Sequence, residues 1–367
     1  MSSSAEIRIT ISRKKIKEYT MKNLILLLIV CGLSCGPLSS KLGAEAPAKK
    51  KTLKIFILAG QSNMQGHCKT SVIENRLKDP NLKVGFEKYH QGGSFVKRAD
   101  VSINHIQQNM HGPLSVGYGA TDTKIGPELS FGWTIGNTLD EDVLIIKAAW
   151  GGKSLFRDFL PPSGKKPNAG FIENLENKAK NKKKPFSREE YMEGFGHYYR
   201  LMMASVEDTL KNLKTYAPDY KGQGYEIAGF VWFQGFNDKF SDHATSTYQE
   251  NMANFIRDVR KDLNSPKLPF VIGAMGHQGT GQKGTTKILA EAQIATAQMA
   301  EFKGNVITVK TADFWDYDAE KAFENKKNDA ATWNKLGSNQ GYHYFGSAAF
   351  FEETGNAFAE AIIQLMK

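Results

Sequence analysis

Short runs of apolar residues recur along the chain and are the clearest pattern in the sequence. They are rich in β-branched side chains and nearly continuous, without a polar residue at every second position. Strands buried on both faces of a parallel sheet have this pattern, whereas half-exposed strands alternate. The pattern predicts five buried strands, at residues 53–59, 143–149, 226–233, 269–275 and 305–311.

Longer segments with apolar residues at helical spacing lie between these runs. The clearest are residues 189–214, 246–263, 285–302 and 347–366. Strands that alternate with helices predict an α/β protein, here a three-layer α/β/α sandwich around a five-stranded parallel sheet. No internal repeat is visible, and no later linker is long enough to divide the chain, so we expect one domain over residues 53–367.

The first 44 residues follow a different pattern. The apolar run at residues 24–33 is too short to span a bilayer as a helix, which takes about 20 residues. With Lys22 before it and the small residues Gly43 and Ala44 after it, the run fits the apolar region of a secretory signal. We therefore expect a protein exported to the periplasm or the medium, without stable membrane insertion after cleavage.

The expected boundaries follow from this signal. Residues 1–44 form the signal region, with Met21 as an alternative start, and residues 45–52 form a linker. Cys35 is an alternative site of lipid attachment, although the residues before it match such a signal poorly.

Charge is distributed unevenly along the 367 residues. The chain has 48 Lys and Arg against 38 Asp and Glu, a formal net charge of +10, which would suit a nucleic-acid-binding protein if the charge were spread over one face. Residues 1–44 account for +5 and residues 161–188 for +6, so the remainder is about neutral. Because basic and aromatic residues are not interleaved, we do not expect a nucleic-acid partner.

The basic segment at residues 161–188 is rich in Pro, Gly, Lys and Asn. This composition is typical of a solvated surface insertion. The functional alternative is a basic lip over a site for an anionic substrate.

Cysteine and histidine positions bear on metals and disulfides. Cys68 is the one cysteine after the signal region, which excludes an intramolecular disulfide and a cysteine-based zinc site. No pair of histidines has ligand spacing together with a third partner, so we expect neither a metal nor a cofactor.

Loops that follow the first two predicted strands hold candidate chemistry, because functional residues in such sheets gather at the carboxyl ends of strands. Ser62 stands two residues beyond Gly60, where a hydroxyl can be presented beside backbone N–H groups; an ordinary helix N-cap is the alternative. Gly151 and Gly152 allow a ligand to approach the backbone closely; a tight turn is the alternative.

Two later loops add an amide and an imidazole. Gln234 ends the third strand, where its side chain can donate to an oxyanion or satisfy buried backbone groups. His343 precedes the last helix, and an imidazole can act as general base for a serine hydroxyl. A loop histidine without a role is the alternative, since the chain has eight histidines.

Taken in order, these loops resemble the SGNH (GDSL-like) hydrolases, most closely their branch of sialate O-acetylesterases and plant-type acetylxylan esterases. The resemblance spans about residues 52–366 and implies the flavodoxin-like SGNH fold and a carbohydrate O-acetylesterase without a cofactor. The matching stretches are GQSNM at 60–64, GPELSFG at 126–132, WGGKSL at 150–155, WFQGFND at 232–238 and GYHYFGSA at 341–348.

The resemblance also implies roles for individual residues. Ser62 would be the nucleophile and His343 the general base. The oxyanion hole would consist of the backbone N–H groups of Ser62 and Gly152 and the side chain of Gln234. Six other positions in the matching stretches become candidate substrate contacts: Gln61, Asn63, Met64, Gly151, Glu128 and Asn237.

Two positions depart from the family's pattern. Gln340 stands where the family usually has the Asp that orients the histidine. The enzyme would then use a Ser–His dyad, Gln340 itself, or another carboxylate such as Asp238 or Asp313. Phe236 stands where a Glu is usual, which makes the wall that faces the substrate more apolar.

The sequence therefore predicts an exported serine esterase that hydrolyses O-acetyl esters on carbohydrates through an acetyl-enzyme intermediate. Its partner would be an acetylated oligo- or polysaccharide, with an anionic polymer as one option. The alternative is a catalytically impaired protein of the SGNH fold that binds glycans without cleaving them.

Overall fold

The computed structural model describes residues 51–367, and the predicted signal region lies outside the described residues. A seven-stranded sheet forms the centre, with the strand order β11-β10-β9-β1-β8-β5-β6. β5 and β6 run antiparallel to each other, and every other neighbouring pair is parallel. The strands are β1 Leu53–Gly60, β5 Arg98–His105, β6 Met110–Leu114, β8 Val143–Ala149, β9 Tyr225–Phe233, β10 Phe270–Ala274 and β11 Val306–Lys310.

Five of these strands are the predicted ones, so the parallel α/β sheet is confirmed and the count of five strands is wrong. β5 and β6 extend the sheet beyond β8. β5 mixes charged and polar residues with apolar ones, and β6 contains Gly112 and Pro113. Because these residues interrupt the apolar pattern, neither strand shows the continuous apolar run on which the prediction depended.

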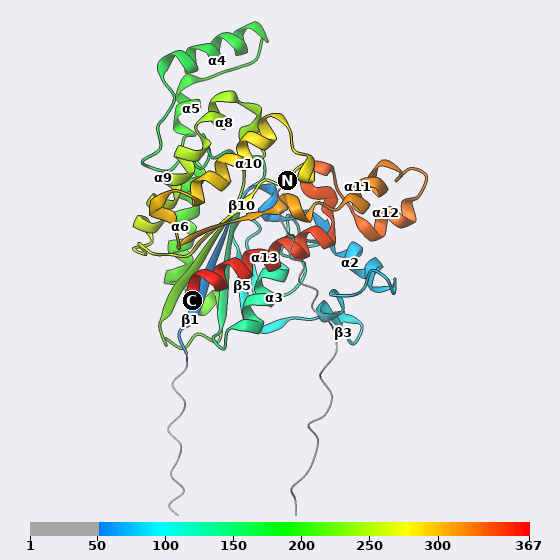
Figure 1. Cartoon of the computed structure of the whole chain (residues 1–367). Coiled ribbons are helices and arrows are strands. Elements are labelled where there is room, and N and C mark those ends of the chain that lie inside the picture. Colours follow the sequence, from blue (N-terminus) through cyan, green and yellow to red (C-terminus); the bar gives the residue numbers. More distant parts are fainter. Residues whose placement is uncertain (1–50) are drawn as a thin grey trace, which may run out of the picture. The chain divides into compact units, whose positions relative to one another are not determined.

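Helices cover both faces of the sheet and make three layers (Figure 1). Alternate residues of β1 divide between the two cores: Phe56 and Leu58 pack in the cluster that includes α13, and Ile55 and Ile57 pack in the cluster that includes α6 and α9. The helices are α1 Ser62–Gln65, α2 Thr70–Leu77, α3 Glu128–Thr138, α4 Ala169–Asn181, α5 Arg188–Glu193, α6 His197–Lys211, α7 Leu213–Tyr216, α8 Asp242–Ser246, α9 Tyr248–Asp262, α10 Gly284–Ala297, α11 Tyr317–Glu324, α12 Ala330–Leu336 and α13 Ala348–Met366.

Three of the four predicted helices correspond to α9, α10 and α13. The fourth, at residues 189–214, is divided into α5, α6 and α7. The first break contains Gly194 and Gly196, and Gly196 has a left-handed φ of +69° that a continuous helix does not allow. Short two-stranded pairs complete the described chain: β2 Cys68–Lys69 with β7 Lys124–Ile125, and β3 His90–Gln91 with β4 Ser94–Phe95.

The basic segment at residues 161–188 contains α4, which stands out from the body of the molecule in Figure 1. The side chain of Asn168 caps this helix by accepting from the N–H of Phe171. Phe171 packs against Phe156, and Ile172 is buried, so one face of α4 rests on the domain. Lysines dominate its C-terminal end and are exposed.

Candidate active site

Ser62 lies where the chain turns from β1 into α1. Gly60 has a φ of +154°, and a Cβ built there would lie 2.2 Å from the carbonyl oxygen of Phe233, so only glycine fits. The carbonyl of Gly60 accepts from the N–H of Trp150 (3.1 Å), and the N–H of Gln61 donates to the carbonyl of Phe233 (3.3 Å). These bonds hold Ser62 where the carboxyl ends of β1, β8 and β9 meet.

The glycine pair lies directly beside Ser62. A Cβ built on Gly151 would lie 3.7 Å from Ser62 Cβ and 2.9 Å from Gln65 Oε1. Gly152 has a φ of +73°, and open space surrounds the position of its absent Cβ. A backbone N–H and a ligand can therefore approach each other at this turn without a side chain between them.

Gln234 makes contacts that differ from those expected of an oxyanion donor. Its Nε2 donates to the carbonyl of Lys153 (2.9 Å) and to Asp238 Oδ2 (2.6 Å), and its Oε1 accepts from the hydroxyl of Tyr248 (2.9 Å). Because a primary amide has two hydrogens, both donors are already in use. In this structure the side chain of Gln234 therefore has no free donor and links the loop after β8 to the loop after β9.

Asp238 shares that linking role. Its carboxylate accepts from the N–H groups of Leu155 and Phe156 (both 2.9 Å) and from Gln234. Burial raises the pKa of Asp238 to about 6. The residue ties the loop after β8 to the loop after β9, so the structure does not place it as the acid partner of His343.

His343 lies on the 3₁₀ segment η6 Gly341–Gly346, which contacts α1. Its Nδ1 is 3.0 Å from Asn339 Oδ1, and that oxygen also accepts from the N–H of Gln340 (2.8 Å). An amide oxygen only accepts, so Nδ1 carries the hydrogen and Nε2 keeps a lone pair. Within residues 51–367, no hydrogen bond connects Ser62 with His343; such bonds commonly tighten only when substrate is bound.

A second histidine lies flat against the first. The rings of His67 and His343 stack with centroids 3.8 Å apart and planes 3° apart, and the ammonium of Lys124 lies 3.4 Å from His67 Nδ1. Burial, with a further contribution from Lys124, lowers the pKa of His343 to about 4. Burial also lowers the pKa of His67 to about 3, helped by His343 and Lys124. Both rings are therefore neutral at neutral pH, as a general base requires.

The other candidates for the third triad position lie away from His343 Nδ1. Gln340 is exposed and contributes its backbone carbonyl, which accepts from the N–H groups of His343 and Phe345. Asp313 is exposed on η5 Thr311–Phe314. The residue that occupies this position is Asn339, which the sequence did not single out.

Among the candidate substrate contacts, four are buried. Met64 belongs to the core and Gln61 Oε1 accepts from the N–H of Gly235 (3.1 Å). Asn63 Oδ1 is buried without a hydrogen-bond partner in the described chain. Gly151 is exposed and Asn237 half-buried, so these two remain open to a ligand.

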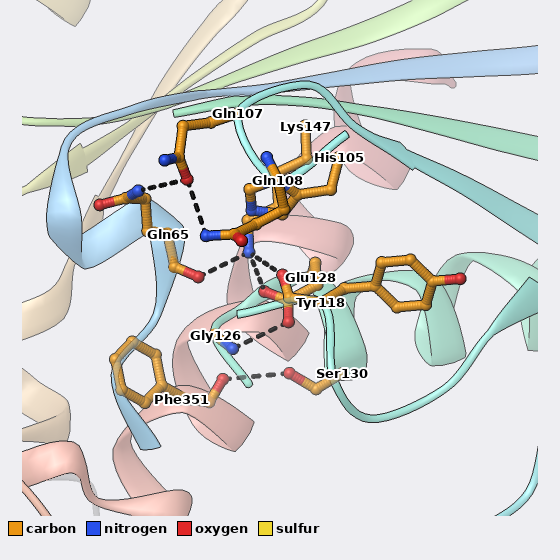
Figure 2. A network of polar contacts seen from close by, with 10 residues as sticks. All are labelled: Gln65, His105, Gln107, Gln108, Tyr118, Gly126, Glu128, Ser130, Lys147 and Phe351. Carbon is orange, nitrogen blue, oxygen red and sulfur yellow. Dashed lines mark hydrogen bonds and ion pairs between the residues drawn. The ribbon is translucent and has the colours of Figure 1, made fainter. Parts of the chain in front are cut away.

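Glu128, the fourth, is fully buried in an ion pair with Lys147 of β8 (Figure 2). The ammonium donates all three hydrogens: to Glu128 Oε2 (2.7 Å), to the carbonyl of Gln65 (2.7 Å) and to the carbonyl of Tyr118 (2.6 Å). Glu128 Oε1 accepts from the N–H of Gly126 (2.8 Å). Burial lowers the pKa of Lys147 and raises that of Glu128, and these bonds oppose both effects. The pair holds the end of α1, and Glu128 is fully buried in it and not exposed to a ligand in this structure.

The residues that sequence reasoning missed lie in loops that it had singled out. Asn339 directly precedes Gln340, and His67 directly precedes Cys68 in the loop after β1. Tyr344 and Phe345 have left-handed φ values of +52° and +59°, and this irregular turn determines which neighbour His343 meets. Residue spacing contains no signal for such a turn.

Among residues 51–367, no group of three or more His, Cys, Asp or Glu side chains is placed to hold a metal ion. In the same part of the chain, no helix combines the length and apolar character needed to cross a membrane.

Comparisons with known proteins bear on the fold and on the family of this chain. A relative from Arabidopsis thaliana, described as the probable carbohydrate esterase At4g34215, is 23% identical over 237 residues, or 62% of this chain and 70% of the relative. The structure of that Arabidopsis protein is similar with a TM-score of 0.50 at 17% identity, over 84% of this chain and 97% of that one, which supports the same fold. The structure of NanS gives a TM-score of 0.45 at 16% identity, over 86% and 98% of the two chains.

A family model identifies the chain more directly. The model of the family described as carbohydrate esterase, sialic acid-specific acetylesterase, matches residues 52–325. The match includes Ser62, the glycine pair and Gln234, and it ends before η6. Because it covers well over half of the sequence, the chain belongs to this family of carbohydrate esterases.

Proposed function

We propose that the protein hydrolyses O-acetyl esters on carbohydrates, with Ser62 as nucleophile and His343 as general base. The observation that carries the proposal is the placement of Ser62 at the carboxyl end of β1, beside Gly151 and Gly152 and on a helix that contacts η6. Family membership supports the reaction class, and the neutral imidazole of His343 supports its role as base.

The reaction would proceed in two steps. Ser62 Oγ attacks the acetyl carbonyl carbon while His343 Nε2 takes the hydroxyl proton, and the sugar oxygen leaves with that proton. Water then attacks the acetyl-enzyme, again assisted by His343, and acetate is released. The oxyanion would accept from the backbone N–H groups of Ser62 and Gly152, because both donors of Gln234 are in use.

Acetate release from acetylated polysaccharides tests the proposal. Ser62→Ala and His343→Ala are each expected to lower kcat by at least about 1,000-fold, and Ser94→Ala, at an exposed serine, provides the matched control. If the wild type and Ser62→Ala are equally inactive on every acetylated sugar while both bind glycans, the esterase proposal fails. The glycan-binding alternative then replaces it.

We also propose export, on the basis of the signal pattern in residues 1–44. Full-length protein expressed in a bacterium should be recovered outside the cytoplasm with residues 1–44 removed, as read by intact mass. A variant with Asp in place of Leu26 and Leu28 should stay inside the cell. Cys35→Ser should be released equally well; retention of only the wild type in the membrane would favour lipid attachment.

The basic end of α4 supports an anionic acetylated polymer as substrate. Lys178, Lys180 and Lys182–Lys184 are all exposed. Replacing these five lysines by Gln is expected to raise KM severalfold on an anionic acetylated polysaccharide such as pectin at low salt, and to leave KM unchanged on a neutral one. The difference should disappear at about 0.5 M salt. An equal change in KM on both substrates would show that these lysines do not attract an anionic substrate by their charge.

A further inference from the structure

A row of aromatic side chains leads from the candidate base to the surface. Tyr342 lies 4.5 Å from His343 between ring centroids, Phe236 lies 5.9 Å from Tyr342, and Phe240 lies 5.4 Å from Phe236. Phe240 is 71% exposed and Tyr342 is 45% exposed. We call Phe236, Phe240 and Tyr342 the aromatic strip.

Neighbouring side chains hold the aromatic strip in place. Phe236 meets the ring of His277 at 5.3 Å, and His277 meets the buried Trp315 at 5.7 Å. The ammonium of Lys239 lies 3.9 Å from the centroid of Phe236 and 5.2 Å from that of Phe240. These contacts hold the two phenyl rings together, so the exposed face is formed before any ligand arrives.

We propose that the aromatic strip is a subsite for the pyranose rings of an oligosaccharide chain, next to the sugar that bears the acetyl group. This inference rests on the proposed function and names the part of the substrate that the strip recognises. Aromatic faces carry a negative quadrupole and a large apolar area, which suit the C–H face of a pyranose ring. The strip is continuous with His343 through Tyr342, so a chain lying on it would continue into the candidate active site.

A second copy of the chain is the other occupant that such a patch suggests. A stable protein interface buries roughly 800 Å² on each partner, whereas one aromatic side chain buries about 150–250 Å². Phe240 and Tyr342, the two well-exposed members, supply well below that area. The strip therefore fits a saccharide better than a protein partner.

Binding to an inactive variant tests the strip independently of catalysis. Unacetylated xylohexaose and mannohexaose are titrated by calorimetry into the Ser62→Ala protein, into Ser62→Ala/Phe240→Ala, and into Ser62→Ala/Tyr225→Ala. Tyr225 is 43% exposed at the amino end of β9, the opposite edge of the sheet, and serves as the matched control. Loss of Phe240 should weaken binding of at least one hexasaccharide by about three- to tenfold, and loss of Tyr225 should not.

Kinetics complete the test. Phe240→Ala should raise KM on an acetylated hexasaccharide by the same factor and leave kcat and KM on triacetin, which has no sugar ring, unchanged. If Phe240→Ala changes neither the affinity for the hexasaccharides nor the KM, the subsite proposal fails, and the proposed esterase activity is unaffected. Binding through Phe240 without any acetate release would overturn the proposed function and retain the strip. A dimer that Phe240→Ala converts to monomer, with unchanged sugar binding, would assign the patch to a second copy instead.

Discussion

His343 meets a neutral amide where serine hydrolases usually have a carboxylate. Asn339 fixes the tautomer of the imidazole, since its oxygen accepts from Nδ1, but an amide does not stabilise the imidazolium that forms during attack. Burial and the ammonium of Lys124 add to the preference of His343 for the neutral state. The proposed base therefore has a fixed tautomer but is weak, which suits esters better than amides.

Asn339→Asp should strengthen the base. A carboxylate about 3 Å from Nδ1 is expected to raise the pKa of His343 by about one to two units and kcat by roughly tenfold at pH 8, whereas Asn339→Ala should lower kcat by roughly tenfold. Steady-state kinetics on triacetin measure both effects. Asn334→Asp, at an exposed asparagine on α12, is the control, and an identical gain in that variant would show that the effect is one of general charge.

The pH dependence of catalysis follows from the same environment. Because the pKa of His343 is lowered to about 4, the base stays unprotonated down to that pH, and kcat/KM should fall tenfold per unit only below about pH 4. Lys124→Met removes a positive charge and should raise the pKa of His343, so the acidic limb of the pH profile of kcat/KM should move to higher pH. A limb near pH 6.5 in the wild type, with recovery of activity after return to pH 7, would show that the surroundings of His343 do not lower its pKa.

At the scale of elements, α1 is only four residues long and is held by bonds from outside it. Strand ends contribute the contacts of Gly60 and Gln61, and Lys147 of β8 binds the carbonyl of Gln65 at the other end of the helix. Figure 2 shows that this lysine lies between the helix, the segment at Tyr118 and the start of α3. The position of Ser62, the proposed nucleophile, therefore depends on the buried side chain of Lys147.

Removing one member of that ion pair should be worse than removing both. Lys147→Met leaves Glu128 buried without its partner and is expected to lower the free energy of unfolding by about 3–5 kcal/mol. Lys147→Met/Glu128→Met should recover part of this loss, because the carbonyls of Gln65 and Tyr118 still lack their donor. Urea unfolding measures these values. The exposed pair Lys83–Glu87 is the control, and Lys83→Met should change stability by less than about 1 kcal/mol.

The kcat of these two variants distinguishes a loss of stability from a displacement of α1. Both should lose kcat on triacetin, because the carbonyl of Gln65 lacks its donor in each. A double variant that recovers stability and full kcat would contradict the anchoring of α1 by Lys147.

Some of these elements were predictable from the sequence and others were not. β1, β8, β9 and β10 were predictable because each is largely buried on both faces and reads as an apolar run. The edge strand β11 is only partly buried and was predictable because its sequence VITVK is rich in β-branched residues. β5 has polar residues such as Asn104 and His105 buried in its interior, so its sequence looks unlike a strand. The carboxyl ends of the strands located Ser62, Gly152 and Gln234, but which atoms Gln234 meets depends on Asp238 and Tyr248, which only the fold brings together.

At the scale of the whole molecule, the buried histidines make stability sensitive to acid. Burial lowers the pKa values of His67, His105, His277 and His343 to about 3, 2, 4 and 4. On unfolding their pKa values return to about 6.5, so at pH 5 the unfolded chain binds about four more protons at these sites. The contribution of these histidines to stability should therefore fall as pH decreases below about 6.5 and continue to fall until about pH 2, the lowest of these pKa values.

Thermal unfolding between pH 7 and pH 4.5 measures this dependence. His67→Phe keeps an aromatic ring against His343 and removes one titrating group, so its Tm should decline less steeply with acid than that of the wild type. Phe240→Leu, at an exposed residue that carries no titrating group, should leave the slope unchanged. If Tm declines equally steeply with acid in all three proteins, His67 does not contribute to the pH dependence of stability.

The ion pair of Glu128 and Lys147 has a consequence for the history of the sequence. Either residue can be lost only by passing through a protein with one buried, unpaired charge, which is a large barrier to single mutations. The two positions, 19 residues apart in the chain, should therefore change together or not at all as lineages diverge. A relative with an apolar residue at one of them is expected to have an apolar residue at the other.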